Sequence, residues 1–125
     1  MIENEVTETF IGCALRVHRK LGPGLLESVY EECVAYEMVK IGLYFERQKA
    51  LPVVYETIKL EAGYRVDFII EHKVIIELKA VEALNEVHLA QLMTYLRLTD
   101  CRLGLLMNFN VTLLRQGIRR VANNL

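Results

Sequence analysis

The chain of 125 residues lacks the features that identify several large classes of protein. Its three cysteines, Cys13, Cys33 and Cys101, lie far apart and form no CxxC or cysteine–histidine pair of the kind that binds zinc. No apolar stretch approaches the ~18–20 residues that a membrane-spanning helix needs. The first residues are acidic and lack the basic-then-apolar order of a signal peptide. We therefore expect reduced, buried cysteines and a cytoplasmic location.

An overall excess of positive charge, which is typical of many nucleic-acid-binding proteins, is also missing. The net charge is −1 and the isoelectric point is about 6.3. The charge is uneven, however, because residues 97–125 carry five arginines and one acid. A positive end on an acidic body fits a contact surface for phosphate. It equally fits ordinary solvated arginines, so charge alone leaves the two explanations open.

The composition that is present indicates one globular domain over residues 1–125. Apolar residues make up 53% of the chain and charged residues 25%. A chain of this length buries one hydrophobic core without metal or disulfide support. No internal repeat, low-complexity tract or linker divides it.

Hydrophobic periodicity predicts helices and strands in a mixed order. Helices are expected over 5–20, 25–41 and 84–98. Strands are expected over 44–55, 58–62, 64–70, 74–80 and 103–109, with Pro52 indicating an edge strand or a break. Residues 112–121 fit a short helix or a strand. The order ααβββαβ with an uncertain tail predicts an α/β (α+β) fold with helices against a mixed sheet.

Residues 64–79 carry the strongest functional signal in the sequence. If residues 71–73 form a turn, the antiparallel partner of Asp67 is Glu77 and that of Arg65 is Lys79. The alternation of side chains predicts that one face is entirely apolar and lies on the core. That face contains Val66, Phe68, Ile70, Val74, Ile76 and Leu78.

Two carboxylates directly opposite each other destabilise a sheet, so something must offset their repulsion. A divalent cation such as Mg²⁺ accepts one or two carboxylates together with waters. The neighbouring Lys79 offers part of the compensation. An ordinary surface face with a cross-strand lysine–glutamate pair is the alternative that this geometry leaves open.

Two helices place further polar side chains within reach of such a site. Helix 84–98 carries His88, Gln91 and Tyr95 on one stripe. Helix 25–41 carries Glu27, Tyr30 and Glu31 in its first turns. Each set also has a structural explanation, because the tyrosines fit half-buried packing positions and a first-turn glutamate is favoured by the helix dipole.

Together these residues resemble a known pattern. Gly24-Leu-Leu-Glu27-Ser-Val-Tyr30 fits the signature of the GxxExxY protein family. Asp67, nine intervening residues and then Glu77-Leu78-Lys79 resemble the core of the PD-(D/E)XK nuclease superfamily, with Val66 in place of the proline. Gln91-Leu-Met-Thr-Tyr95 resembles the QxxxY motif of its RecB-like branch. The resemblance covers roughly residues 5–122.

The resemblance implies a restriction-endonuclease-like αβββαβ core with an extra N-terminal helix and a site for Mg²⁺ or Mn²⁺. Asp67, Glu77 and the backbone carbonyl of Leu78 would be metal ligands, joined by Glu27. Lys79 would orient or activate the attacking water, so the expected catalytic residues are Asp67, Glu77, Lys79 and Glu27. The candidate substrate-binding residues are Gln91, Tyr95, His88, Tyr30 and Arg65.

The sequence therefore favours a metal-dependent nuclease that acts on DNA, with RNA as the other substrate. A metal on two carboxylates acidifies water and relieves charge at phosphorus, and a lysine adds positive charge where negative charge develops. The alternative is a non-catalytic module that binds nucleic acid or assembles with other proteins on the same fold. Because the chain has no appended DNA-binding domain, a homo-oligomer or a partner protein would supply the grip on the substrate.

Overall fold

Three helices and five strands form the fold, which is described by a computed structural model of residues 1–125, the side chain of Ala62 excepted. The helices are α1 (Glu3–Leu21), α2 (Glu27–Lys40) and α3 (Glu86–Thr99). The strands are β1 (Phe45–Tyr55), β2 (Ile58–Ile70), β3 (Val74–Lys79), β4 (Leu103–Asn108) and β5 (Ile118–Ala122). A short 3₁₀ helix, Leu114–Gly117, precedes β5.

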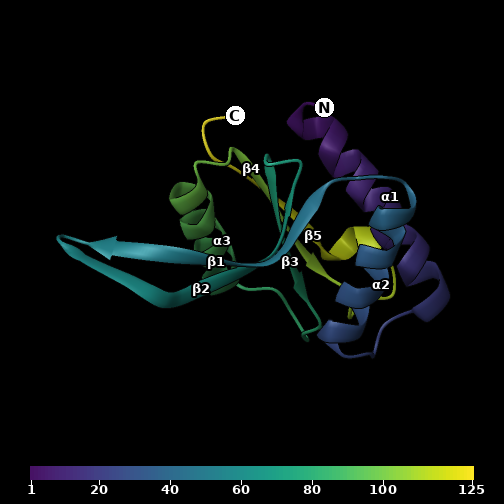
Figure 1. The fold of residues 1–125 in the computed structure, drawn as a ribbon. Helices are drawn as coiled ribbons and strands as arrows, with labels where there is room; N and C mark the ends of the chain where they lie inside the picture. The colour runs from purple at the N-terminus through teal and green to yellow at the C-terminus, as the bar shows by residue number, and fades with distance from the viewer.

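The strands form one mixed sheet in the order β1-β2-β3-β4-β5. β3 and β4 run parallel, and all other neighbours are antiparallel. Figure 1 shows α1 and α2 on one side of the sheet and α3 on the other. One hydrophobic cluster lies beneath α1 and α2, and a second lies beneath α3. Both faces of the central strands are therefore buried, and the expected restriction-endonuclease-like order of elements is confirmed.

The helices end where the sequence offers a left-handed or capping residue. Gly22, with φ 64°, and Gly42, with φ 72°, follow α1 and α2. Asn85 caps α3 by accepting a hydrogen bond from the backbone N–H of His88. Among the helices described, none combines the length and the apolar character needed to cross a membrane. The three cysteines are free thiols; Cys13 and Cys101 are buried and Cys33 is half-buried.

The hairpin of β2 and β3 has the predicted register. Phe68 pairs with Ile76, and Ile70 pairs with Val74. Pro52 lies on the edge strand β1, where the register shifts between Leu51 and Val53. The prediction of an edge strand or a break at this proline is therefore confirmed on both counts.

Three details of the prediction were wrong or left open. The runs 58–62 and 64–70 form one long strand, because β1 pairs with both. Val66 is buried, but it packs in the cluster beneath α3 instead of with Phe68. The alternation fails between them at Asp67, opposite Gln48 of β1, which has a left-handed φ of 49° and which the β1–β2 pairing skips. The tail resolves into the 3₁₀ turn and β5.

Candidate active site

Asp67 and Glu77 lie where β2 and β3 separate. The last backbone pair before them is Phe68 with Ile76. Beyond this pair, the backbone N–H groups of the two strands donate to carboxylate side chains instead of to backbone carbonyls. The N–H of Asp67 donates to Glu77 Oε2 at 2.7 Å, and the N–H of Leu78 donates to Asp67 Oδ2 at 2.8 Å. The two carboxylates are thus fixed across the opening between the strands by neutral backbone donors.

Gln48 of β1 completes the support of Asp67. Its side-chain nitrogen donates to Asp67 Oδ1 at 3.0 Å and also to Glu31 of α2. Arg47, the preceding residue, donates to Glu31 Oε2 at 2.9 Å and bonds Glu32 as well. The side chains of Arg47 and Gln48 therefore connect the edge strand to α2, and Gln48 also connects it to Asp67.

Glu27 and Lys79 belong to the same electrostatic group as the two strand carboxylates. The negative charge of Asp67 acts on Glu27, and that of Glu27 acts on Glu77. Desolvation raises the pKa of all three carboxyl groups, and the ammonium of Lys79 opposes that rise in each of them. Lys79 forms none of the ion pairs found in the described chain, and its side chain is half-buried. The fold thus brings together the four residues that the sequence selected as catalytic.

Burial makes the group difficult to ionise. Desolvation, followed by repulsion from Asp67, raises the pKa of Glu77 to about 8. Desolvation also raises the pKa of Asp67 and of Glu27 above their ordinary values. Glu77 is 6% exposed. A cluster of acids with raised pKa values beside one lysine is typical of functional sites, because a cation or substrate compensates the unfavourable charge.

The α3 side of the site is formed by Gln91 and Tyr95. Tyr95 is buried and meets the ring of Tyr64 edge-on at 5.6 Å between centroids. Desolvation and the charges of Glu77 and Asp67 raise the pKa of Tyr95 to about 12, with an opposing contribution from the Gln91 side chain. Gln91 itself is partly exposed. Tyr95 therefore remains a neutral hydroxyl near the carboxylates.

Three expected substrate-binding residues have roles within the fold. Tyr30 is fully buried and stacks on Phe109, and its hydroxyl donates to the carbonyl of Gly22. His88 accepts a hydrogen bond from the N–H of Asn85 and so completes the cap of α3. Arg65 is exposed and donates to the backbone carbonyl of Gln48. The structure brings Arg65 next to the site and leaves Tyr30 in the core.

The acid of the 71–73 turn and the arginines near the end of the chain lie away from the carboxylates. Glu71 is in the turn at the far end of the β2–β3 hairpin. Arg119 and Arg120 are on β5, two strands from β3, and Arg120 bonds Asn4 of α1. None of the five arginines after residue 96 influences the pKa of Asp67 or Glu77.

The donor set suits a hard divalent cation, although it offers few side chains. Within the described residues, no three side chains of His, Cys, Asp or Glu gather closely enough to form a complete ligand set. Two carboxylates completed by a backbone carbonyl and waters are nevertheless a normal environment for Mg²⁺. The raised pKa values of Asp67 and Glu77 fit this use, because a cation would remove the repulsion that the fold tolerates.

Sequence reasoning missed Gln48 and Arg47. Neither has a motif, and their contacts depend on a long-range pairing of β1 with β2. The only local signal is a run of four polar residues, 46–49, which interrupts the alternation expected of a strand.

Comparison with known proteins adds one finding. The family model of the PD-(D/E)XK nuclease superfamily matches residues 4–121, which is nearly the whole chain and includes every candidate residue above. Comparison with curated proteins and with solved structures gave no match. Because one family model covers the fold except for its terminal residues and includes the acidic site, the chain belongs to the PD-(D/E)XK nuclease superfamily.

Proposed function

We propose that this protein is a divalent-metal-dependent nuclease that hydrolyses phosphodiester bonds in DNA, with RNA as the second substrate to test. One observation carries the proposal. Asp67 and Glu77 are fixed side by side where two strands separate, next to Lys79, in a chain that belongs to a nuclease superfamily.

The ligands proposed for Mg²⁺ or Mn²⁺ are Asp67, Glu77 and the carbonyl of Leu78, with Glu27 acting directly or through water. When bound, such an ion acidifies water and acts as a Lewis acid toward phosphate. The hydrogen bonds from the N–H groups of Asp67 and Leu78 hold the two carboxylates in place before any ligand arrives. This preorganisation supports the proposal, because the carboxylates need no rearrangement to act together.

Lys79 is proposed to act on the reacting phosphate. Its ammonium lies close enough to influence the carboxyl groups of Glu27, Asp67 and Glu77. Within the described chain it forms no ion pair of its own. It can donate a hydrogen bond to the attacking water and place positive charge where negative charge develops. Gln91 and Tyr95 are proposed to contact the nucleic-acid backbone with neutral donors.

A cleavage assay with matched variants tests the proposal. Plasmid, linear and single-stranded DNA, and RNA, are incubated with wild type in Mg²⁺ or Mn²⁺ and in EDTA. We expect metal-dependent cleavage that Asp67→Asn and Lys79→Met each abolish. Glu8→Gln, which changes an exposed glutamate of α1 far from the proposed ligands in sequence, should cleave as wild type does. Cleavage that persists in the Asp67→Asn protein would refute the proposed site.

A second candidate is a non-catalytic module that binds nucleic acid on this fold. The absence of a three-residue ligand set in the described chain favours it. Calorimetry with Mg²⁺ separates the two candidates and needs no choice of substrate. Only the nuclease requires that the wild type bind Mg²⁺ and that Asp67→Asn remove this binding. Binding of labelled nucleic acid without turnover or metal uptake would support the second.

A further inference from the structure

A two-stranded arm extends beyond the body of the protein. It consists of residues 51–64, the end of β1 and the start of β2, joined by the turn at Glu56 and Thr57. Figure 1 shows it projecting from the sheet past α3. Leu51 and Tyr64 at its base are anchored, since Leu51 is buried and Tyr64 packs on Tyr95. The rest of the arm has no neighbouring layer.

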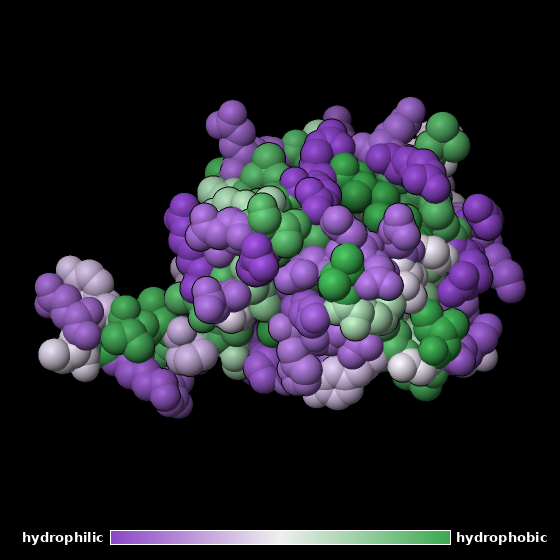
Figure 2. Space-filling model, turned by 90° about the horizontal axis from the view of Figure 1, so that it is seen from above, coloured by the Kyte–Doolittle hydropathy of each residue, from purple (hydrophilic) through white to green (hydrophobic). Residues whose placement is uncertain are grey.

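One face of this arm is entirely apolar. Val53 pairs with Leu60, and Tyr55 pairs with Ile58, so these four side chains lie on the same side of the ribbon. Tyr55 is 65% exposed, Ile58 56% and Leu60 49%. Hydrophobic side chains follow the arm in Figure 2. An isolated two-stranded ribbon is marginally stable in water, so an exposed apolar face of this kind indicates an interaction surface.

The surface does not resemble a nucleic-acid wedge. The arm carries two acids, Glu56 and Glu61, and one base, Lys59, so its net charge is −1. Side chains that insert into DNA are normally accompanied by arginine or lysine contacts to phosphate. The occupant is therefore expected to be a protein surface that is apolar with a positive rim.

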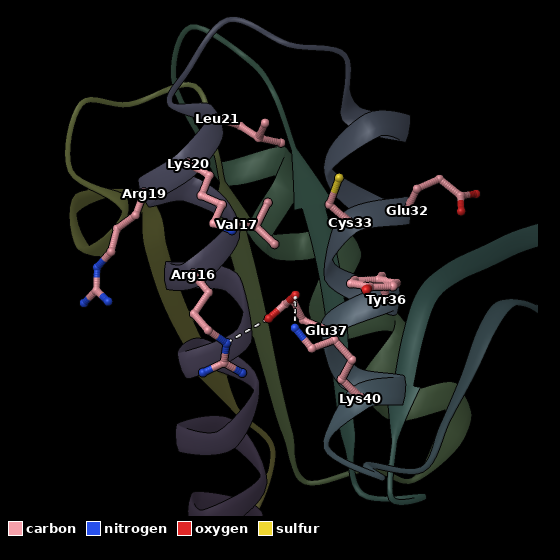
Figure 3. Close-up of a pocket in the computed structure, with 10 residues that line it drawn as sticks. All are labelled: Arg16, Val17, Arg19, Lys20, Leu21, Glu32, Cys33, Tyr36, Glu37 and Lys40. Atoms are coloured by element: carbon pink, nitrogen blue, oxygen red, sulfur yellow. Dashed lines mark hydrogen bonds and ion pairs between the residues drawn. The ribbon is translucent and has the colours of Figure 1, made fainter.

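The protein itself has such a surface at its other end. A hollow of about 600 Å³ lies between α1 and α2, floored by Val17, Leu21, Cys33 and the exposed ring of Tyr36 (Figure 3). Four basic and two acidic residues surround it, a balance of +2. Lys20 extends along this hollow, and no ion pair of the described chain includes it. Because Figure 1 shows the arm and the α1–α2 pair at opposite ends, an arm cannot fill its own hollow.

We propose that the arm of one copy docks, apolar face down, in the α1–α2 hollow of a second copy of this chain. The apolar side chains of the arm contact the apolar floor of the hollow, and Glu56 at the tip contacts the basic residues around Lys20.

The buried area agrees with a dimer in which two copies exchange their arms. Four side chains at roughly 100 Å² each cover about half of the ~800 Å² that one partner contributes to a standard interface. When two copies exchange their arms, each copy contributes both an arm and a hollow, so the area that each partner buries is doubled.

Light scattering after gel filtration tests the contact over a range of concentrations. We expect wild type to have the mass of a dimer or of a larger self-assembly. An arm variant, Tyr55→Ser with Ile58→Ser, and a hollow variant, Tyr36→Ser with Lys20→Glu, should each be monomeric. Mixed together, the two variants should form a one-to-one complex, because one intact arm and one intact hollow remain. Lys59→Ser with Glu61→Ser, on the opposite face of the arm, should assemble as wild type does.

Two results would overturn the proposal. One is a wild type that stays monomeric at every concentration. The other is a mixture of the arm and hollow variants that does not form a one-to-one complex, including the case of arm-to-arm contact, in which the hollow variant stays assembled by itself. Circular dichroism confirms that each variant is folded.

An exchange of charges provides a second measurement. Glu56→Lys should weaken assembly, and Lys20→Glu in the same chain should restore it. None of these residues belongs to the proposed nuclease site, so the two proposals fail independently.

Discussion

Replacing Glu77 by glutamine should stabilise the metal-free protein at neutral pH. The side chain is buried, and burial together with Asp67 raises its pKa to about 8 from an ordinary value of 4.5. Between these two pH values the unfolded chain releases a proton that the folded chain keeps. The contribution of Glu77 to the free energy of unfolding is therefore most favourable below about pH 4.5, and it declines as the pH rises toward 8.

The magnitude follows from the same shift. Each pH unit in this window removes up to ~1.4 kcal/mol from the free energy of unfolding. The interval from 4.5 to 7 spans about 2.5 units, so ionisation linked to Glu77 lowers stability at pH 7 by about 3 kcal/mol. Glutamine carries no charge at any pH, and its carbonyl oxygen can still accept from the N–H of Asp67. We expect a gain of about 1–3 kcal/mol at pH 7, or roughly 4 °C in Tm per kcal/mol.

Urea unfolding in EDTA at several pH values measures this gain. The difference between Glu77→Gln and wild type should grow from pH 5 to pH 8 and disappear at about pH 4, where the glutamate is neutral in both states. Glu8→Gln removes one charge at an exposed site and should give no such curve. A gain independent of pH, or a loss of stability at pH 7, would refute the account of the opposed carboxylates.

Three further substitutions test other contacts. Gln48→Glu replaces a shared donor by a third carboxylate, and it should lower metal-free stability by on the order of 1–3 kcal/mol while Mg²⁺ restores part of the loss, measured by melting with and without the ion. Tyr30→Phe removes the hydroxyl that closes the 22–25 loop, and it should cost roughly 1–2 kcal/mol in urea unfolding without changing Mg²⁺ affinity. Gly117→Ala would place a Cβ 2.2 Å from the backbone oxygen of Asn108, so a loss of about 3 kcal/mol in the same assay is expected.

The hairpin register could be predicted because two constraints act on the same short segment. The turn around His72 fixes which residues face each other, and the alternation of apolar side chains fixes which face is buried. A slip by one residue would move Phe68 and Ile76 from the cluster beneath α1 and α2 to the smaller cluster beneath α3. The positions of Asp67 and Glu77 follow from that register, so the center of the site was accessible to local reasoning.

The remaining parts depend on contacts distant in sequence. Nothing around Gln48 indicates a left-handed backbone, which is uncommon for a residue other than glycine, asparagine or aspartate. This residue lies opposite the break in the alternation of β2, and its side-chain amide donates a hydrogen bond to Asp67. The arm is a similar case, because 58–62 and 64–70 look like separate strands until β1 pairs with both.

The groups that donate hydrogen bonds to Asp67 are neutral, and their neutrality affects how the site can bind a cation. Asp67 is held by two backbone or amide N–H groups, and Arg47 directs its charge to Glu31 and Glu32 instead. An arginine at position 48 would hold Asp67 more strongly, but it would also neutralise the charge that attracts a cation. A neutral amide fixes the geometry and adds no positive charge that would compete with a bound cation. Desolvation, together with repulsion from neighbouring carboxylates, raises the pKa values of Asp67 and Glu77, which is the expected exchange of stability for function at a binding site.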